Sequence, residues 1–368
     1  MDIDELLRRA QEISASDVHL RVGSSPVLRI DGILIGQEDI QPLTIEDMDL
    51  ILERITTVEK RNSFARELAV DFAYSLAGTF RFRVGVIRQK GTVSIVFHRV
   101  PLYIPSIDEM ELPQLYKELA LKPRGLILVT GPTGNGKSTT LATMINHVNE
   151  NLPKSVISIE DPIEFVHHNK KSIVAQQELG EDTTSFDKSL IHAVRHNPDV
   201  IVVGEMRDLK TISAVITAAE TGHLVLGTLH TTDAVQTIDR VVDLFPPIQQ
   251  QQIKLQLSQV LEAVLSQTLV PRIGGGRIAA VEILVVTNAI RNLIREGKTY
   301  QIRSTMELGS KHGMQTLNQA LAELVMRGLV TREDAMMKSS NPLQLKELLG
   351  FSGVIDAKPW PPFIDQIT

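Results

Sequence analysis

One loop constrains the fold more than any other feature of this chain. Residues 131–138 read Gly-Pro-Thr-Gly-Asn-Gly-Lys-Ser, a complete match to the pattern G-x-x-x-x-G-K-[ST]. The loop follows a short apolar segment at 126–130 and opens an amphipathic one, the order of a strand, a phosphate loop and a helix. Its glycines let backbone N–H groups turn toward a phosphate, and the helix N-terminus adds positive potential. The sequence therefore predicts a nucleotide-binding α/β domain.

The pattern assigns roles to two side chains of the loop. Lys137 can reach the β- and γ-phosphates of a nucleotide, and the hydroxyl of Ser138 can ligate Mg²⁺. The loop predicts a nucleotide site but leaves the reaction open. We expect the nucleotide to be bound by Gly131, Pro132, Thr133, Gly134, Asn135, Gly136, Lys137, Ser138 and Thr139.

Alternating strands and helices extend this prediction to residues 124–285. Apolar segments at 156–159, 200–203 and 224–226 resemble the one before the loop, and helical patterns separate them. That alternation is typical of a parallel sheet covered by helices on both faces. A hairpin is expected at 272–283, around three consecutive glycines.

Other local signals predict where elements begin and end. Asp208 is expected to be a helix N-cap, and residues 184–187 read as a capping box. Residues 286–350 are expected to be helical, and 351–368, which follow no pattern, to form a flexible tail. Turns between the last helices are expected at Gly297, Gly313 and Gly328.

In residues 1–100 the predicted strands and helices do not alternate one by one, which predicts a small α+β domain. At 80–84, Phe-Arg-Phe-Arg-Val alternates strictly, so Arg81 and Arg83 should share one face of a strand. Prolines mark 101–123 as a linker with one short helix near 115–119. The elements expected before this linker are helices at 4–13 and 44–66 and strands at 18–22, 27–30, 72–76, 80–88 and 92–99.

Acidic residues and histidines lie at the ends of the predicted strands. Glu205 follows one apolar strand, and Glu160 and Glu164 follow another. Parallel strands end at one edge of a sheet, so Glu205 is a candidate Walker B carboxylate beside the phosphate loop. His223 and His230 flank a third strand, and His230, at its carboxyl end, should face the site. A solvated acidic turn and ordinary surface histidines are the alternatives that these residues leave open.

Together, these segments resemble the secretion and type IV pilus ATPase family of P-loop hexamers, and within it the PilT-type retraction ATPases of twitching motility. The resemblance covers about residues 1–340, and the family often has Ser where this chain has Asn135. The matching motifs are SASDVHL (14–20), GPTGNGKST (131–139), SIEDPIEFVH (158–167), DVIVVGEMRD (199–208), AAETGHLVLGTLHT (218–231) and AIRNLIREGK (289–298). The GEMRD and AIRNLIREGK stretches favour the main motor over the accessory PilU-type paralogue, in which an extended tail also occurs.

The resemblance implies a fold and a set of roles. A PAS-like N-terminal domain would precede a RecA-like P-loop ATPase core with a helical C-terminal part, and ATP and Mg²⁺ would be the cofactors. Glu205 would be the catalytic base, while Glu160 and Glu164 would hold metal or water. His230 would sense the γ-phosphate, and His223 would support it. The expected Mg²⁺ ligands are Ser138, Glu160 and Glu205.

The family's hexameric ring implies further expectations. Each nucleotide would lie between the ATPase domain of one subunit and the N-terminal domain of the next. Arg81, Arg83 and Arg99 would then be trans arginine fingers. The expected partners are other copies in a homohexamer, a platform protein of the inner membrane and a paralogous retraction ATPase. The expected location is the cytoplasm, at the inner face of the membrane.

Composition narrows the alternatives. With no Cys, the chain cannot carry the tetracysteine zinc loop usual in pilus extension and type II secretion ATPases, which also have longer N-terminal regions. Net charge −6 and 4% aromatic residues argue against a nucleic-acid translocase, so no nucleic acid is expected. A small-molecule P-loop kinase would need neither the histidine motif nor the N-terminal domain. No apolar run approaches the ~18 residues of a membrane span, and the N-terminus lacks a signal-peptide pattern.

Overall fold

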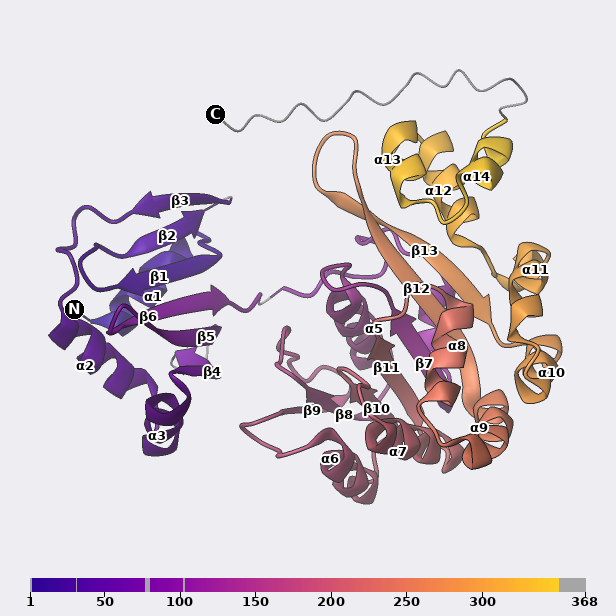
Figure 1. Cartoon of the computed structure of the whole chain (residues 1–368), viewed down its shortest axis with the longest axis horizontal. Helices are drawn as coiled ribbons and strands as arrows, with labels where there is room; N and C mark the ends of the chain where they lie inside the picture. Colours follow the sequence, from indigo (N-terminus) through magenta and orange to yellow (C-terminus); the bar gives the residue numbers. More distant parts are fainter. Residues whose placement is uncertain (1, 31, 77–79, 102, 351–368) are drawn as a thin grey trace.

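Two sheets, each with its own helices, make up the chain in the computed structural model (Figure 1). The structure describes residues 2–30, 32–76, 80–101 and 103–350, so the expected tail at 351–368 lies outside the described residues. Within those ranges, no helix is both long enough and apolar enough to cross a membrane.

The N-terminal sheet is a six-stranded antiparallel sheet in the order β3-β2-β1-β6-β5-β4. Its buried face includes Phe82, Val84 and Val86, which alternate with Arg81 and Arg83 along one strand, as predicted. Its elements are α1 (Ile3–Glu12), β1 (Asp17–Arg21), β2 (Val27–Ile30), β3 (Ile33–Gly36), α2 (Ile45–Ile55), α3 (Val58–Glu67), β4 (Ala69–Leu76), β5 (Phe80–Gln89) and β6 (Thr92–Arg99).

The single helix predicted at 44–66 is wrong, because the chain forms two helices there. Thr56 leaves α2 in an extended conformation, and Thr57 begins α3 by accepting a hydrogen bond from the Lys60 N–H at 3.4 Å. A threonine side chain that caps a new helix outweighs the continuous apolar pattern. Strand β3 was not predicted, because its sequence Ile-Leu-Ile-Gly shows no alternation of apolar and polar residues; all four residues are exposed.

The C-terminal sheet has seven strands in the order β13-β12-β7-β11-β10-β8-β9. All neighbours pair in parallel except β12 and β13, which form an antiparallel hairpin. The strands are β7 (Gly125–Thr130), β8 (Ser155–Glu160), β9 (Ile173–Glu178), β10 (Val200–Val203), β11 (Leu224–Leu229), β12 (Leu261–Pro271) and β13 (Arg277–Val285).

Helices cover both faces of this sheet, as predicted. Leu126 and Leu128 of β7 pack into a core with α7, α8 and α9, whereas Ile127 and Val129 pack into a second core with α4 and α5. These helices are α4 (Leu115–Ala120), α5 (Lys137–Asn151), α7 (Leu209–Glu220), α8 (Ala234–Asp243) and α9 (Pro247–Val260), and α6 (Phe186–Ala193) packs beside α7.

Most local signals lie where they were predicted. Asp208 is the N-cap of α7, and its carboxylate accepts a hydrogen bond from the Thr211 N–H at 3.0 Å. The capping box at 184–187 is wrong: Ser185 is the N-cap of α6, and its side chain makes no capping hydrogen bond. The expected hairpin is the tip of the longer β12–β13 hairpin. The last helices are α10 (Asn288–Glu296), α11 (Ile302–Glu307), α12 (Leu317–Met326), α13 (Arg332–Lys338) and α14 (Pro342–Leu348), with positive-φ turns at Gly297, Gly313 and Gly328.

Candidate nucleotide site

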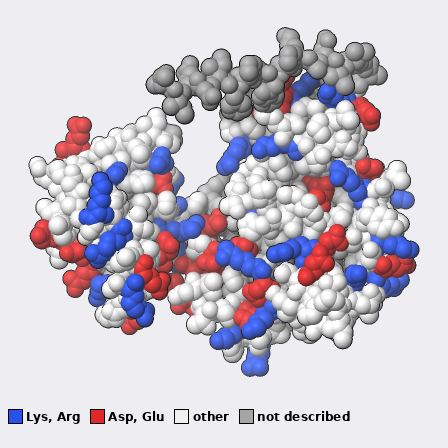
Figure 2. Space-filling model, viewed as in Figure 1, with Lys and Arg blue, Asp and Glu red and all other residues white. Residues whose placement is uncertain are grey.

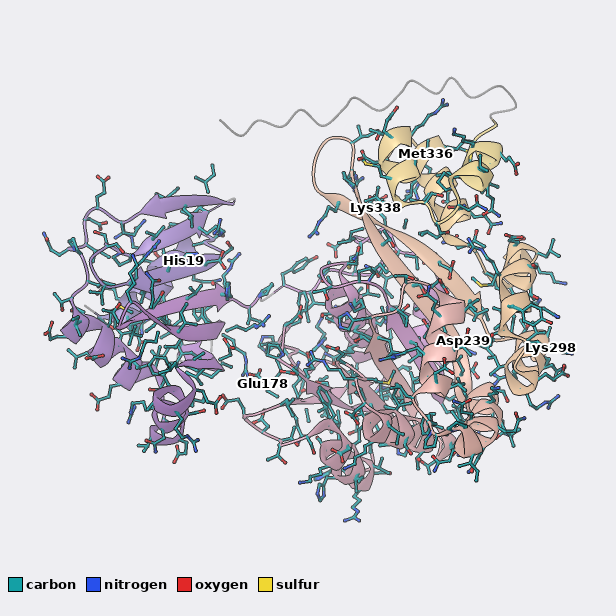
Figure 3. All side chains as sticks on the ribbon, viewed as in Figure 1. His19, Glu178, Asp239, Lys298, Met336 and Lys338 are labelled. Carbon is teal, nitrogen blue, oxygen red and sulfur yellow. The ribbon has the colours of Figure 1, made fainter. Side chains whose placement is uncertain are left out.

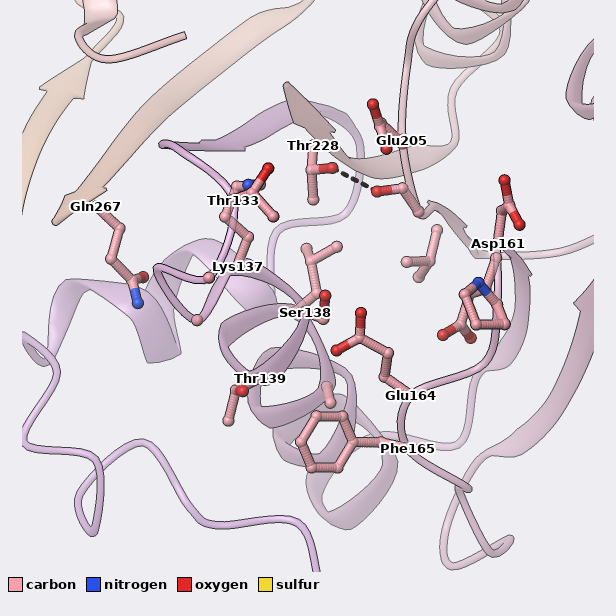
Figure 4. A pocket seen from close by; sticks show the side chains of 18 of the residues that line it. Thr133, Lys137, Ser138, Thr139, Asp161, Glu164, Phe165, Glu205, Thr228 and Gln267 are labelled. Atoms are coloured by element: carbon pink, nitrogen blue, oxygen red, sulfur yellow. Dashed lines mark hydrogen bonds between the residues drawn. The ribbon is translucent and has the colours of Figure 1, made fainter. Parts of the chain in front are cut away.

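The phosphate loop joins β7 to α5 and borders a cavity of about 640 Å³ (Figure 4). That volume is in the range of small-molecule sites. Gly131, Gly134 and Gly136 all have positive φ, so the loop needs residues without a side chain. At Gly131 a Cβ would also lie 2.3 Å from the Gln267 carbonyl oxygen. The cavity is lined by Thr133, Gly134, Gly136, Lys137, Ser138 and Thr139, while Gly131, Pro132 and Asn135 shape the loop from outside it.

Lys137 folds back over the loop that carries it. Its Nζ donates to the carbonyl oxygens of Gly131 and Pro132, at 2.7 and 3.1 Å. Burial lowers the pKa of this amine, and the nearby charges of Glu205 and Glu164 oppose that shift. Its closest partners are neutral carbonyls, and a cation in a cradle of backbone N–H groups fits a phosphate, which would supply the missing negative charge.

Strand β12 braces the loop, a feature that the sequence did not reveal. The side-chain oxygen of Asn135 accepts a hydrogen bond from the Leu269 N–H at 2.8 Å. The Gln267 amide donates to the Asn135 carbonyl oxygen at 2.8 Å and accepts from the Thr140 hydroxyl at 2.8 Å. Asn135 is therefore more than a permissive position, and the role of Gln267 depends on strand pairing that no local pattern encodes.

Glu205 and His230 lie at the same edge of the sheet as the loop. His230 Nε2 is 2.9 Å from a Glu205 carboxylate oxygen, and its Nδ1 is 3.4 Å from both Lys137 Nζ and the Thr133 hydroxyl. The histidine thus connects the predicted base to the phosphate loop. His223 lies at the opposite end of β11, where its ring contacts the Ala218 carbonyl at 2.9 Å, so it does not line this cavity.

Arg207 binds Glu205, the predicted base, although the sequence analysis assigned no role to this arginine. Its guanidinium donates to both carboxylate oxygens of Glu205 at 2.7 Å, which is a bidentate pair. The Arg207 hydrogen bonds, followed by those of His230, lower the pKa of Glu205 despite its partial burial. The signal was present in the sequence, since this arginine belongs to the GEMRD stretch. A second basic residue not predicted is Arg277 of β13, which lines the cavity.

Glu160, the last residue of β8, and Glu164, which follows the strand, both line the cavity but differ in their surroundings. Glu160 accepts hydrogen bonds from the Ser158 hydroxyl and the Gln176 amide, at 2.7 and 3.0 Å, and burial raises its pKa. Glu164 lines the cavity, and Figure 4 shows its carboxylate pointing toward Ser138. In the part of the chain that the structure describes, no three His, Asp or Glu residues are grouped to hold a metal. A hydroxyl and one carboxylate fit Mg²⁺, which commonly takes few protein ligands beside substrate phosphates.

The three predicted arginine fingers do not line this cavity, and they do not share one environment. Arg83 is exposed. Arg81 forms an ion pair with Glu178 of its own chain at 2.8 Å. Arg99 pairs in register with Phe82, and because directly opposed residues share a face, it belongs to the face of Phe82 rather than that of Arg83.

Comparisons with known proteins agree with this architecture. The family model described as type II/IV secretion system protein matches residues 1–338. The type IV pilus retractation ATPase PilT of Pseudomonas aeruginosa is 46% identical over 93% of this chain and 99% of its own length. The type IV pilus ATPase PilU of the same organism is 38% identical over 95% of this chain and 92% of its own. A crystal structure titled as the pilus retraction motor PilT with bound ADP has a TM-score of 0.88, with 46% identity over 94% of this chain and 99% of that one.

Proposed function

The chain belongs to the family of type II/IV secretion system proteins, and we propose that it is a hexameric ATPase that powers type IV pilus retraction in twitching motility. The observation that carries the proposal is the contact series Lys137–His230–Glu205, in which a phosphate-loop cation and a candidate base share one cavity. The full-length similarity to the PilT retractation ATPase supports pilus retraction as the work done.

Each residue of the cavity has its own role in the proposed reaction. Lys137 would exchange its two carbonyl partners for the β- and γ-phosphates of ATP. Glu205 would accept the proton of the attacking water, and His230 would report the γ-phosphate to it. Mg²⁺, when bound, neutralises phosphate charge, and Ser138 with Glu164 would hold it. Glu160 accepts a hydrogen bond from Ser158, which favours a role in orienting Glu164 and water rather than in holding the metal.

The PilT and PilU types are two pilus ATPases within the family, and a nucleic-acid translocase is an alternative of another class. The accessory PilU type is less similar than the PilT type, at 38% against 46% identity, which favours the main motor. A translocase would need a basic or aromatic strand-binding surface. On the face shown in Figure 2, basic and acidic side chains of the described residues are instead interspersed over both sheets.

We further propose the assembly and location that the resemblance implied. A homohexamer would work in the cytoplasm, against a platform protein at the inner face of the membrane, with a paralogous retraction ATPase as a second partner. Arg83, exposed on β5, would reach the nucleotide of a neighbouring subunit.

Two measurements test the function. The purified protein should hydrolyse ATP at a rate that DNA does not change. Deletion of the gene should abolish twitching while surface pili remain. Turnover that depends on DNA would indicate a translocase, and loss of the pili themselves would indicate an extension motor.

A further inference from the structure

An ion pair connects the two halves of this chain beside the nucleotide cavity. Arg81, on β5 of the N-terminal sheet, donates to a carboxylate oxygen of Glu178, the last residue of β9, at 2.8 Å. The Glu178 side chain is only 4% exposed. Figure 3 shows Glu178 on the side of the C-terminal sheet that faces the N-terminal sheet. Although Arg81 was expected to act on a neighbouring subunit, this pair lies within one subunit.

The same oxygen of Glu178 also binds the backbone of the acidic loop, which we define as residues 161–164. The N–H of Ile163 donates to it at 3.0 Å. Asp161 and Glu164, which line the nucleotide cavity, lie on either side of this residue. One buried carboxylate therefore joins an arginine of the N-terminal domain to the backbone that positions the acids of the site.

Burial makes the two contacts of Glu178 depend on each other. A buried carboxylate that loses its paired cation is strongly unfavourable, and we expect it to move toward water. That movement weakens its bond to the Ile163 N–H. The Nε of Arg81 is buried without a hydrogen bond, and the side-chain ion pair described for this arginine is the one with Glu178. The acidic loop should therefore respond when the N-terminal domain moves away from β9.

We propose that Arg81 is a positioning residue that acts within its own subunit, holding the acidic loop in place through Glu178. Docking of the N-terminal domain then sets the geometry of the cavity's acids. The inference rests on the proposed ATPase function for its kinetic consequence, and on the contacts alone for its structural one. It removes Arg81 from the trans arginine fingers and leaves Arg83 in that role.

The first test needs no nucleotide. Hydrogen exchange of the Ile163 amide should be about tenfold faster in Arg81→Gln than in the wild type, the scale of one charge-assisted hydrogen bond. Arg81→Lys should restore part of the protection. The matched control is Lys60→Gln, which breaks another ion pair between the two halves, to Glu181 at 2.6 Å, without touching the acidic loop. Equal exchange rates in wild type, Arg81→Gln and Lys60→Gln would overturn the inference.

The second test separates action within a subunit from action between subunits. Arg81→Gln should lower kcat by up to about 10²-fold, since small displacements of positioned groups are costly, and leave KM for ATP within about twofold. Mixing it with Lys137→Ala protein should restore no activity, because the subunit with an intact phosphate loop still has a displaced acidic loop.

Failure of the Arg81 inference and failure of the proposed ATPase function would give different results. Recovery of ATPase activity in the mixture would show that Arg81 acts in trans, and it would overturn the inference while leaving the ATPase function intact. Wild-type protein without ATPase activity would refute the proposed function, and the exchange measurement would still decide the role of Arg81.

Discussion

His230 is the residue at which the phosphate loop and the candidate base meet, and its two ring nitrogens face Lys137 and Glu205. The γ-phosphate of ATP would enter next to this histidine, where it would compete with the loop carbonyls for the charged amine of Lys137. Lys137 also contacts the Gly131 carbonyl and Glu205 also binds Arg207, so the two residues can be tested by separate substitutions.

Lys137→Ala should abolish ATP hydrolysis, since it removes the cation that the phosphates would bind. The fold should persist, because among the described residues the hydrogen-bond partners of Nζ are carbonyl oxygens of its own loop and the ring of His230. Turnover and thermal unfolding measured on the same preparation check this. A stable Lys137→Ala protein with normal turnover would refute the site.

Glu205→Gln keeps the shape of the base and removes its charge. ATP binding should survive, while hydrolysis falls by roughly 10²–10⁴, the usual contribution of a general base. Binding and single-turnover rates measure the two effects separately. If Glu160→Gln gave this result and Glu205→Gln did not, the roles of the two acids would have to be exchanged.

The pH dependence follows from the partners of Glu205. Arg207 and His230 face its carboxylate and hold its pKa below the ordinary glutamate value, so the charged base persists as the pH falls. Arg207→Gln removes the larger influence and should raise that pKa. The acidic limb of the kcat profile should therefore move to higher pH in Arg207→Gln. An unchanged or downward-shifted limb would show that another group controls it.

At the scale of elements, the brace from β12 makes the phosphate loop depend on a strand far along the chain. Asn135→Ala removes the acceptor of the Leu269 N–H, and nucleotide affinity should fall about fivefold, as expected for ~1 kcal/mol of a lost hydrogen bond. The matched control is Asn151→Ala, at the other end of α5, which loses a hydrogen bond from the side-chain amide to the His147 carbonyl. Titration with a fluorescent nucleotide measures both, and equal affinities would mean that the brace has no effect on binding.

Sequence patterns could predict the parts of the site that depend on strand order. The phosphate loop, Glu205 and His230 each follow an apolar strand, and parallel strands end at one edge. Gln267, Glu178 and the face of Arg99 depend on which strands pair and in what register. Such pairings leave no local pattern in a single sequence, and β9, which joins the sheet by parallel pairing with β8, was not predicted for the same reason.

At the scale of the whole molecule, the cavity carries the phosphate loop and the acids, but Arg83 lies exposed on the other sheet. If a neighbouring subunit supplies this arginine, Arg83→Ala should lower turnover while each subunit still binds ATP. Trans arginines of this kind contribute about 10³–10⁵ to rates. A loss confined to binding would contradict a catalytic role.

Mixing two impaired proteins tests that geometry. In a ring built from Arg83→Ala and Lys137→Ala subunits, some interfaces pair an intact phosphate loop from the first with an intact arginine from the second. Those interfaces hold every catalytic group, so ATPase activity should return on mixing. Labelled subunits and nucleotide-binding stoichiometry verify that exchange and binding occur. With both verified, wild-type turnover by Arg83→Ala alone would make this arginine an ordinary strand residue, and Arg99 would be the next candidate because Arg81 is held by Glu178.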